Sequence, residues 1–182
     1  MALPPYSGAA LDHIKFAFET IKKNPVPWII INLVFLFVPL VNFLFAIQFC
    51  RVVKDCVEND KAPEIGDLFN TDNLGSDVTT IFIAAGCVFI SFLACILPGY
   101  FVAIAISMVL FVTADNKLSG MDAVKAAFYW GKANWIHSFG TLFVIGFITQ
   151  MSIYACGLGL LIFAPLMHIA HYNWFRGHRE AI

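Results

Sequence analysis

The sequence contains little charge. Asp, Glu, Lys and Arg make up only 13% of the residues, whereas hydrophobic residues make up 60% and 19 residues are Phe. A soluble domain usually has about a quarter of its residues charged. Residues 78–114 and 133–175 contain no Asp, Glu, Lys or Arg, and each stretch is longer than the roughly 20 residues that cross a bilayer once. The composition therefore indicates a membrane protein and predicts that each stretch crosses and returns.

The sequence also lacks the patterns of several chemical sites. Its five Cys residues include no CxxC pair, which argues against a zinc site or a disulfide framework. It contains no recognisable nucleophile motif, phosphate-binding glycine loop or pair of carboxylates that would face a cleft. The net charge of −1 gives no reason to expect binding to nucleic acid. We therefore expect no catalytic residues, no cofactor, no metal site and no nucleic-acid partner, and so a protein that is not an enzyme.

Three apolar blocks, at 26–50, 78–114 and 135–175, make up most of the chain. Each block is interrupted by an uncharged sequence rich in turn-forming residues, namely "VPLVN", "LPGY" and "CGLG". These breaks predict three helical hairpins. We therefore expect an all-α, polytopic helical membrane bundle of about six membrane segments, built as one integral membrane domain over residues 1–182.

The basic residues indicate the orientation of this bundle. All 11 Lys and Arg residues lie outside the breaks, at the outer ends of the blocks. Short loops rich in Lys and Arg stay in the cytoplasm. If each block is a hairpin, every basic residue is cytoplasmic, and we therefore expect a multi-pass protein with both termini cytoplasmic.

The first block allows two interpretations. Residues 26–38 would span only about 20 Å as a helix, whereas the hydrocarbon core is about 30 Å thick. This half of the block would then enter the membrane without crossing it, which makes the first hairpin re-entrant. The alternative is one helix over 26–50, kinked at Pro39, which would place residues 51–77 on the outside.

Two segments of the chain repeat one pattern. The sequences "LDHIKFAFETIKKN" (11–24) and "MDAVKAAFYWGKAN" (121–134) carry Asp, Lys, Ala, Phe, Lys and Asn at equivalent positions. Both are typical of interfacial amphipathic helices, which we predict over 9–24 and 119–134, with Phe18 and Phe128 on their apolar faces. These faces lie either on lipid or on the ends of the bundle's own helices. The internal repeat suggests a duplicated unit of one amphipathic helix and one membrane hairpin.

Three longer sequences carry a family resemblance. "FETIKKNPVPWIIINLVFLF", "LPGYFVAIAISMVLFVTADNKLSGMDAVKAAFYWGKANW" and "CGLGLLIFAPLMHIAHYNWFRG" together cover much of the chain. They resemble the six-helix bacterial inner-membrane proteins related to the membrane domain of glycerophosphodiester phosphodiesterases. The resemblance implies six membrane helices and a bacterial inner membrane. It carries over no catalytic residues, because that family is largely uncharacterised.

A few polar side chains fall within or near the apolar blocks. His168 and His171 are three residues apart and therefore share a helix face, and Gln48 and Gln150 could face one another to form a polar path with them. The alternative is that the histidines belong to an interfacial aromatic and basic belt, and that the glutamines are hydrogen-bonding links between helices. Both blocks after residue 77 lack the charged groups of ion-coupled transporters, which counts against transport.

Gly99, Ala103 and Ser107 recur every four residues and form a ridge of small side chains. Such ridges let membrane helices approach closely, either within one chain or between copies. From these features we expect a non-enzymatic integral inner-membrane protein that acts as a membrane-organising or accessory subunit. Its expected partners are membrane lipids and either further copies of itself or a larger membrane complex. The alternative is a channel or carrier for a small or lipid-like solute.

Overall fold

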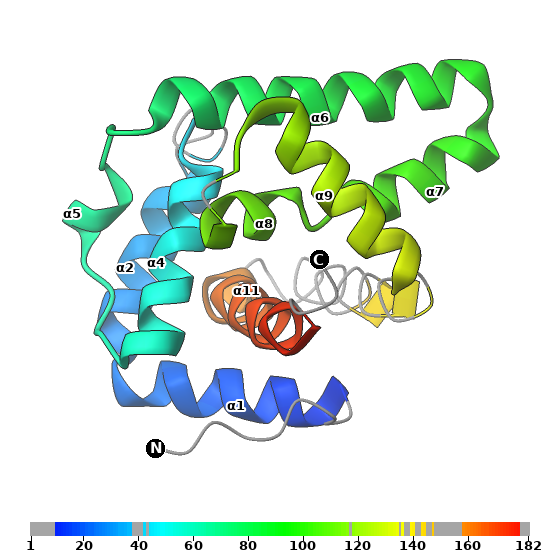
Figure 1. Cartoon of the computed structure of the whole chain (residues 1–182). Coiled ribbons are helices and arrows are strands. Elements are labelled where there is room, and N and C mark those ends of the chain that lie inside the picture. Colours follow the sequence, from blue (N-terminus) through cyan, green and yellow to red (C-terminus); the bar gives the residue numbers. More distant parts are fainter. Residues whose placement is uncertain are drawn as a thin grey trace.

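The structure, a computed structural model, describes residues 10–37, 42, 44–116, 118–134, 136, 139–140, 143–144, 147 and 158–178. Within these residues all regular secondary structure is helical, which confirms the all-α prediction. The elements are α1 (Ala10–Lys23), α2 (Pro25–Phe37), α4 (Ala46–Asn59), α5 (Ile65–Leu68), α6 (Leu74–Ala94), α7 (Ile96–Ile106), α8 (Val109–Asn116), α9 (Gly120–Ala133) and α11 (Leu158–His178). In Figure 1, α6 runs along one edge of the molecule and α1 along the opposite edge.

Among the residues that the structure describes, α6 is the one helix long and apolar enough to cross a membrane. It has 21 residues, and its most apolar segment has a mean hydropathy of 2.0. Only 17% of that segment is buried in the protein. The apolar helical stretches Pro25–Val34 and Gly99–Asp115 are shorter. The structure therefore establishes a helical architecture with one candidate span, which is a coarser result than six membrane segments.

The middle apolar block turns back at Cys95. This residue is extended (φ −170°, ψ 143°) between the end of α6 and the start of α7, and α7 folds back against α6 (Figure 1). We predicted this break at "LPGY", around Pro98, but Pro98 lies in the first turn of α7. Proline fits there because the first backbone N–H groups of a helix have no partner within the helix.

The second half of this block is not one continuous helix. It divides into α7 and α8, which are separated by Ser107 and Met108. Ser107 Oγ donates a hydrogen bond to the carbonyl oxygen of Ile104 (2.7 Å), and this satisfies a carbonyl in the last turn of α7. The second half of the predicted hairpin therefore consists of two helices, α7 and α8, in place of one.

The predicted amphipathic helices are both present. The predicted ranges 9–24 and 119–134 correspond to α1 and α9 to within one residue at each end, which is the usual precision of helix boundaries. α1 packs on α11, whereas α9 packs on α6, α7 and α8. Of the remaining two predicted breaks, "VPLVN" lies outside the described residues except for Asn42, whereas the second half of "CGLG", Leu158 and Gly159, begins α11.

The core is rich in aromatic side chains and surrounds α11. This helix contacts α1, α2 and α4, and its Tyr172 and Phe175 are fully buried. The ring of Phe111 from α8 lies 6.0 Å from that of Tyr172 and 6.1 Å from that of Phe175, centroid to centroid. The rings of Trp130 from α9 and Trp174 meet edge to face at 4.9 Å. The helices α8, α9 and α11 therefore share one aromatic core.

Candidate functional site

An ion pair joins the first apolar block to the second. Arg51, on α4, binds both carboxylate oxygens of Asp77, in the first turn of α6: Nη1 lies 2.5 Å from Oδ2 and Nη2 lies 2.8 Å from Oδ1. The same Nη1 donates to Gln48 Oε1 (3.0 Å), and Gln48 Nε2 donates to the carbonyl oxygen of Asp67 (2.8 Å). Asp77 is buried. A two-pronged pair of this kind is both strong and directional, so it fixes α6 on α4.

A second polar group extends this connection to α8 and α11. Lys54, one turn after Arg51, lies 3.2 Å from Asp115 Oδ1 and also donates to the Asp115 carbonyl oxygen. The hydroxyl of Tyr172 lies 2.9 Å from Glu58 Oε1 and 3.2 Å from Asp115 Oδ1. Because this hydroxyl carries one proton, it donates to one carboxylate at a time. Both carboxylates therefore depend on partners from other helices.

We call these residues the polar clamp. It consists of Arg51, Lys54, Glu58, Asp77, Asp115 and Tyr172. The clamp connects α4, α6, α8 and α11. Each of its two cations pairs with one carboxylate, and the third carboxylate, that of Glu58, lies against the Tyr172 hydroxyl. Its evident chemical role is to hold these four helices together.

The clamp was not among the predicted sites, although the sequence carries a signal for it. Arg51 directly follows the block 26–50, Asp77 directly precedes the block 78–114, and Asp115 directly follows it. Each is the charged residue that borders a charge-free stretch. Pairing such bordering residues of opposite sign would have predicted the contacts.

The N-terminal helix is attached to the C-terminal helix by buried polar groups. Asn173 Nδ2 lies 2.9 Å from His13 Nδ1, and Arg176 Nη2 donates to Asn173 Oδ1 (2.9 Å). If the amide donates, Nδ1 of His13 accepts and the imidazole proton is on Nε2. The three side chains are buried between α1 and α11. They attach α1 to α11.

An exposed ion pair joins the end of α1 to the residue that follows α4. Lys23 Nζ, at the end of α1, lies 2.5 Å from Oδ1 of Asp60, which follows α4. The hydrogen bond from the Lys23 ammonium lowers the pKa of the Asp60 carboxyl below its usual value. The pair brings together the residues just before α2 and just after α4, so the chain leaves and returns at one place.

The predicted polar path lacks support in the described residues. Gln48 bonds to Arg51 and to Asp67, as above, and Gln150 lies outside the described residues. His168 Nδ1 lies 2.8 Å from the carbonyl oxygen of Ala164, and its ring packs on Phe49 at 4.9 Å. The His171 ring packs on Phe111 at 6.1 Å. Both histidines therefore belong to the aromatic core, and the described residues contain no cluster of three metal-ligating side chains.

The predicted ridge of Gly99, Ala103 and Ser107 includes one close contact between helices but leaves out another. A Cβ on Gly99 would lie 2.5 Å from Phe92 Cδ1, so this glycine permits the close packing of α6 and α7. Ala103 and Ser107 are only half-buried. α7 makes a second close contact at Ala105, because a Cβ on Gly131 of α9 would lie 2.4 Å from the Ala105 carbonyl oxygen. The predicted ridge does not include this residue.

The internal repeat is visible in the burial of α1 and α9. Ala17 and its counterpart Ala127 are both fully buried, whereas Lys15 and Lys125 are exposed. Phe18 and Phe128 are 55% and 38% exposed. The residues at the centre of the packed faces are therefore the alanines, and the two phenylalanines lie beside these faces. Each helix packs on other helices through one face and leaves a Phe outside it.

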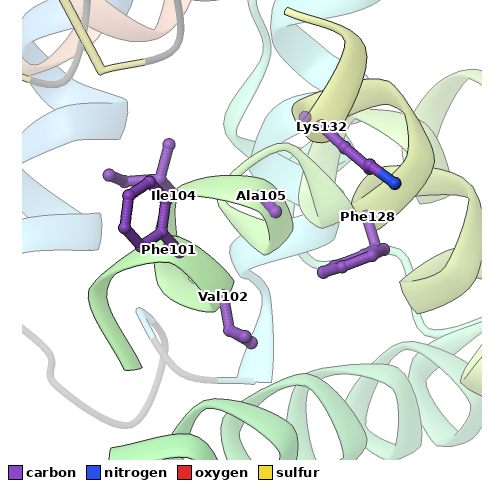
Figure 2. Close-up of a pocket in the computed structure, with 7 residues that line it drawn as sticks. Phe101, Val102, Ile104, Ala105, Phe128 and Lys132 are labelled. Carbon is purple, nitrogen blue, oxygen red and sulfur yellow. The ribbon is translucent and has the colours of Figure 1, made fainter. Parts of the chain in front are cut away.

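A pocket of about 460 Å³ lies between α7 and α9 (Figure 2). Its lining comprises Phe101, Val102, Ile104, Ala105, Phe128, Gly131 and Lys132. In Figure 2, Phe128 and Lys132 extend from α9, while the other labelled side chains come from α7. Lys132 is the one charged residue of this lining, and the other six residues are apolar. The pocket suits an apolar group that carries a negative charge at one end.

The polar clamp and this pocket are the two features of the described chain with functional chemistry. Comparison of the chain with protein-family models, with curated proteins and with solved structures finds no match in any of the three.

Proposed function

We propose that the chain is a non-enzymatic integral membrane protein that acts as a membrane-organising or accessory subunit, in an oligomer or in a larger membrane complex. The observation that carries this proposal is the exposed apolar surface of the α6–α7 hairpin. Its exposed large side chains are Phe82, Phe89, Ile90, Leu93, Tyr100 and Phe101. Removing one such side chain from water is worth roughly 1.5–3 kcal/mol. An extended surface of this kind is typical of helices that face lipid.

The dimensions of α6 suit a membrane crossing. Its 21 residues would extend over about 32 Å, against a hydrocarbon core about 30 Å thick. Asp77 and the polar clamp lie at its N-terminal end, and the exposed Leu93 lies near its C-terminal end. In this placement the clamp is at one membrane surface and the turn at Cys95 is at the other.

The contacts of the first block favour a re-entrant hairpin over one kinked crossing. The Lys23–Asp60 pair brings the start of α2 near the end of α4, so both ends of the block would lie at the same membrane surface. α2 has 13 residues and would extend only about 20 Å. The first block would therefore enter the membrane from the clamp side and return without crossing.

Both termini would share that side. α1 packs on α11, and the His13–Asn173–Arg176 cluster lies between them. These ends of the chain carry basic residues, which favours the cytoplasm. A bacterial inner membrane is what the resemblance to the six-helix inner-membrane proteins implies.

The side chains that fill the interior favour a structural role. The core is filled with aromatic and aliphatic side chains, and the two cations of the clamp pair with carboxylates from other helices. The alternative, a carrier for a lipid-like solute, is favoured by the apolar pocket between α7 and α9. The two functions differ in whether a bound lipid is exchanged across the membrane or stays in place.

The membrane placement can be tested with nitroxide spin labels. Single-cysteine variants Phe82→Cys, at an exposed position near the middle of α6, and Asp55→Cys, in a background without native cysteines, are reconstituted into vesicles. We expect the label at 82 to collide mainly with oxygen, and the label at 55, on the exposed side of α4, mainly with a water-soluble nickel chelate. Equal access of the nickel chelate to both positions would contradict the placement.

The accessory role needs a measurement of assembly. The protein is released from native membranes in polymer-bounded lipid discs and analysed by native mass spectrometry. We expect several copies or a stoichiometric partner protein in each particle. A population consisting only of single chains would contradict an accessory or oligomeric role, and flux of labelled lipid in reconstituted vesicles would favour the carrier.

A further inference from the structure

The pocket between α7 and α9 is formed beside a close contact of two backbones. Because Gly131 has no side chain, α9 lies directly on α7 at Ala105, where a Cβ would be 2.5 Å from the Ala105 Cα. Both residues also line the pocket. The apolar walls on either side of this contact are provided by residues such as Val102 and Phe128 (Figure 2). The shape of the pocket therefore depends on the approach of the two helices.

One wall of the pocket continues onto the surface that we assign to lipid. Phe101 lines the pocket and is 53% exposed, and Tyr100 next to it is also exposed. A hydrocarbon chain lying on the α6–α7 hairpin could therefore enter the pocket without leaving an apolar environment. At about 460 Å³, the volume lies in the range of ligand pockets, roughly 300–1,000 Å³.

A positively charged residue at the edge of the pocket favours apolar ligands that also carry a negative charge. Lys132 is exposed, and it is the one charged side chain of the lining. It lies in the last turn of α9, and its long, flexible side chain lets the ammonium group extend toward the lipid headgroups. A cation above an apolar cavity complements a molecule with an acyl chain and an anionic head.

We propose that this pocket binds one anionic phospholipid of the surrounding bilayer. An acyl chain lies against Phe101, Val102 and Phe128, and the lipid phosphate contacts the ammonium group of Lys132. The inference rests on the proposed membrane placement, and it adds a specific site and a specific class of lipid. The bound lipid would fill the space between α7 and α9 and stabilise their contact.

The test measures lipid retention by native mass spectrometry. The full chain is delipidated in detergent and then titrated with phosphatidylglycerol or with phosphatidylcholine of the same acyl chains. We expect one phosphatidylglycerol to be retained, and Lys132→Ala to reduce its retention at least fivefold. Lys132→Arg should restore retention, because it restores the cation. Lys125→Ala is the matched control, since Lys125 is exposed on the same helix but does not line the pocket.

A second variant tests the cavity itself. Val102→Trp should fill the pocket and reduce the retention of both lipids, whereas inorganic phosphate at equal concentration should not displace the bound lipid. Thermal unfolding of each variant reports whether its fold is intact, and Lys132→Ala is at an exposed position that the fold tolerates. Wild-type retention by Lys132→Ala, or equal binding of the two lipids to the wild-type protein, would overturn the proposal. The spin-label result does not depend on this site, so the membrane placement and the lipid site can fail separately.

Discussion

Arg51 holds both carboxylate oxygens of Asp77, at 2.5 and 2.8 Å, across 26 residues of sequence that form the turn from the first apolar block into the second. Arg51 ends one charge-free stretch, and Asp77 begins another. Their contact places the end of the first block next to the start of the second. With Lys54, Glu58, Asp115 and Tyr172, the pair gathers the ends of three blocks at one place.

The first prediction concerns this ion pair. Asp77→Asn should lower the free energy of unfolding by about 3 kcal/mol, because it leaves the partly buried guanidinium of Arg51 without its counter-charge. Asp55→Asn, at an exposed position on α4, should change it by less than about 0.5 kcal/mol. The measurement is equilibrium unfolding in detergent micelles. Equal stabilities of the two variants would show that the pair does not hold α6 on α4.

The second prediction concerns the hydroxyl group of the clamp. Tyr172→Phe removes the donor that lies between Glu58 and Asp115, and we expect a loss of roughly 1–3 kcal/mol because the carboxylates lose a hydrogen-bond partner. Tyr129→Phe makes the same chemical change at a side chain that is 69% exposed and should be nearly neutral. Comparison of the two melting curves isolates the buried hydroxyl. A neutral Tyr172→Phe would mean that water replaces the hydroxyl.

The third prediction compares two glycines that differ in surroundings. Gly131→Ala should destabilise the protein by roughly 1–3 kcal/mol, since the added Cβ meets the backbone of Ala105 and α9 must move away from α7. Gly86→Ala should instead stabilise it by about 0.5–1 kcal/mol, because no atom lies within 4 Å of the new Cβ and alanine favours a helix. Thermal unfolding would show opposite signs. Two changes of the same sign would argue against the close α7–α9 contact.

The fourth prediction tests the internal repeat. Ala17→Glu and Ala127→Glu each place a charge at a fully buried position of an amphipathic helix, and each should destabilise the protein by several kcal/mol. Lys15→Glu and Lys125→Glu, at equivalent exposed positions, should have little effect. The readout is thermal stability after solubilisation. If only one of the two alanines is sensitive, the helices do not occupy equivalent environments.

The substitutions Phe18→Glu and Phe128→Glu separate packing from lipid contact. Both side chains are at least a third exposed, so we expect these variants to keep most of their stability in detergent. In a bilayer we expect these variants to protect α1 and α9 less from hydrogen exchange, because a charge replaces an apolar side chain that contacts lipid.

The helices were predictable from sequence wherever one periodicity acts over a whole element. The range of α1 followed from apolar and charged residues that recur at helical spacing, and that of α9 from its likeness to α1. The break of the middle block was misplaced because Pro98 was read as a helix end. Proline also fits the first turn of a helix, and here the chain turns three residues earlier, at Cys95.

The contacts between elements were harder to predict. The ridge of Gly99, Ala103 and Ser107 follows a spacing of four, but Ala105 is the α7 residue that meets Gly131. Which face of α7 meets another helix depends on how α9 crosses it, and that crossing is a tertiary property. For the same reason the sequence did not indicate that Ala17 is the fully buried residue of α1, beside the exposed Phe18.

The most direct test of the central claim, that the block ends gather at one membrane surface, is labelling of intact cells with an impermeant thiol reagent. One variant keeps Cys95 as its sole cysteine, and others carry a single cysteine at position 59, 119 or 177 in a cysteine-free background. We predict that Cys95 is labelled from outside, whereas positions 59, 119 and 177 are labelled only after the membrane is permeabilised. Labelling of position 59 from outside together with protection of position 177, or protection of all four positions, would contradict the account.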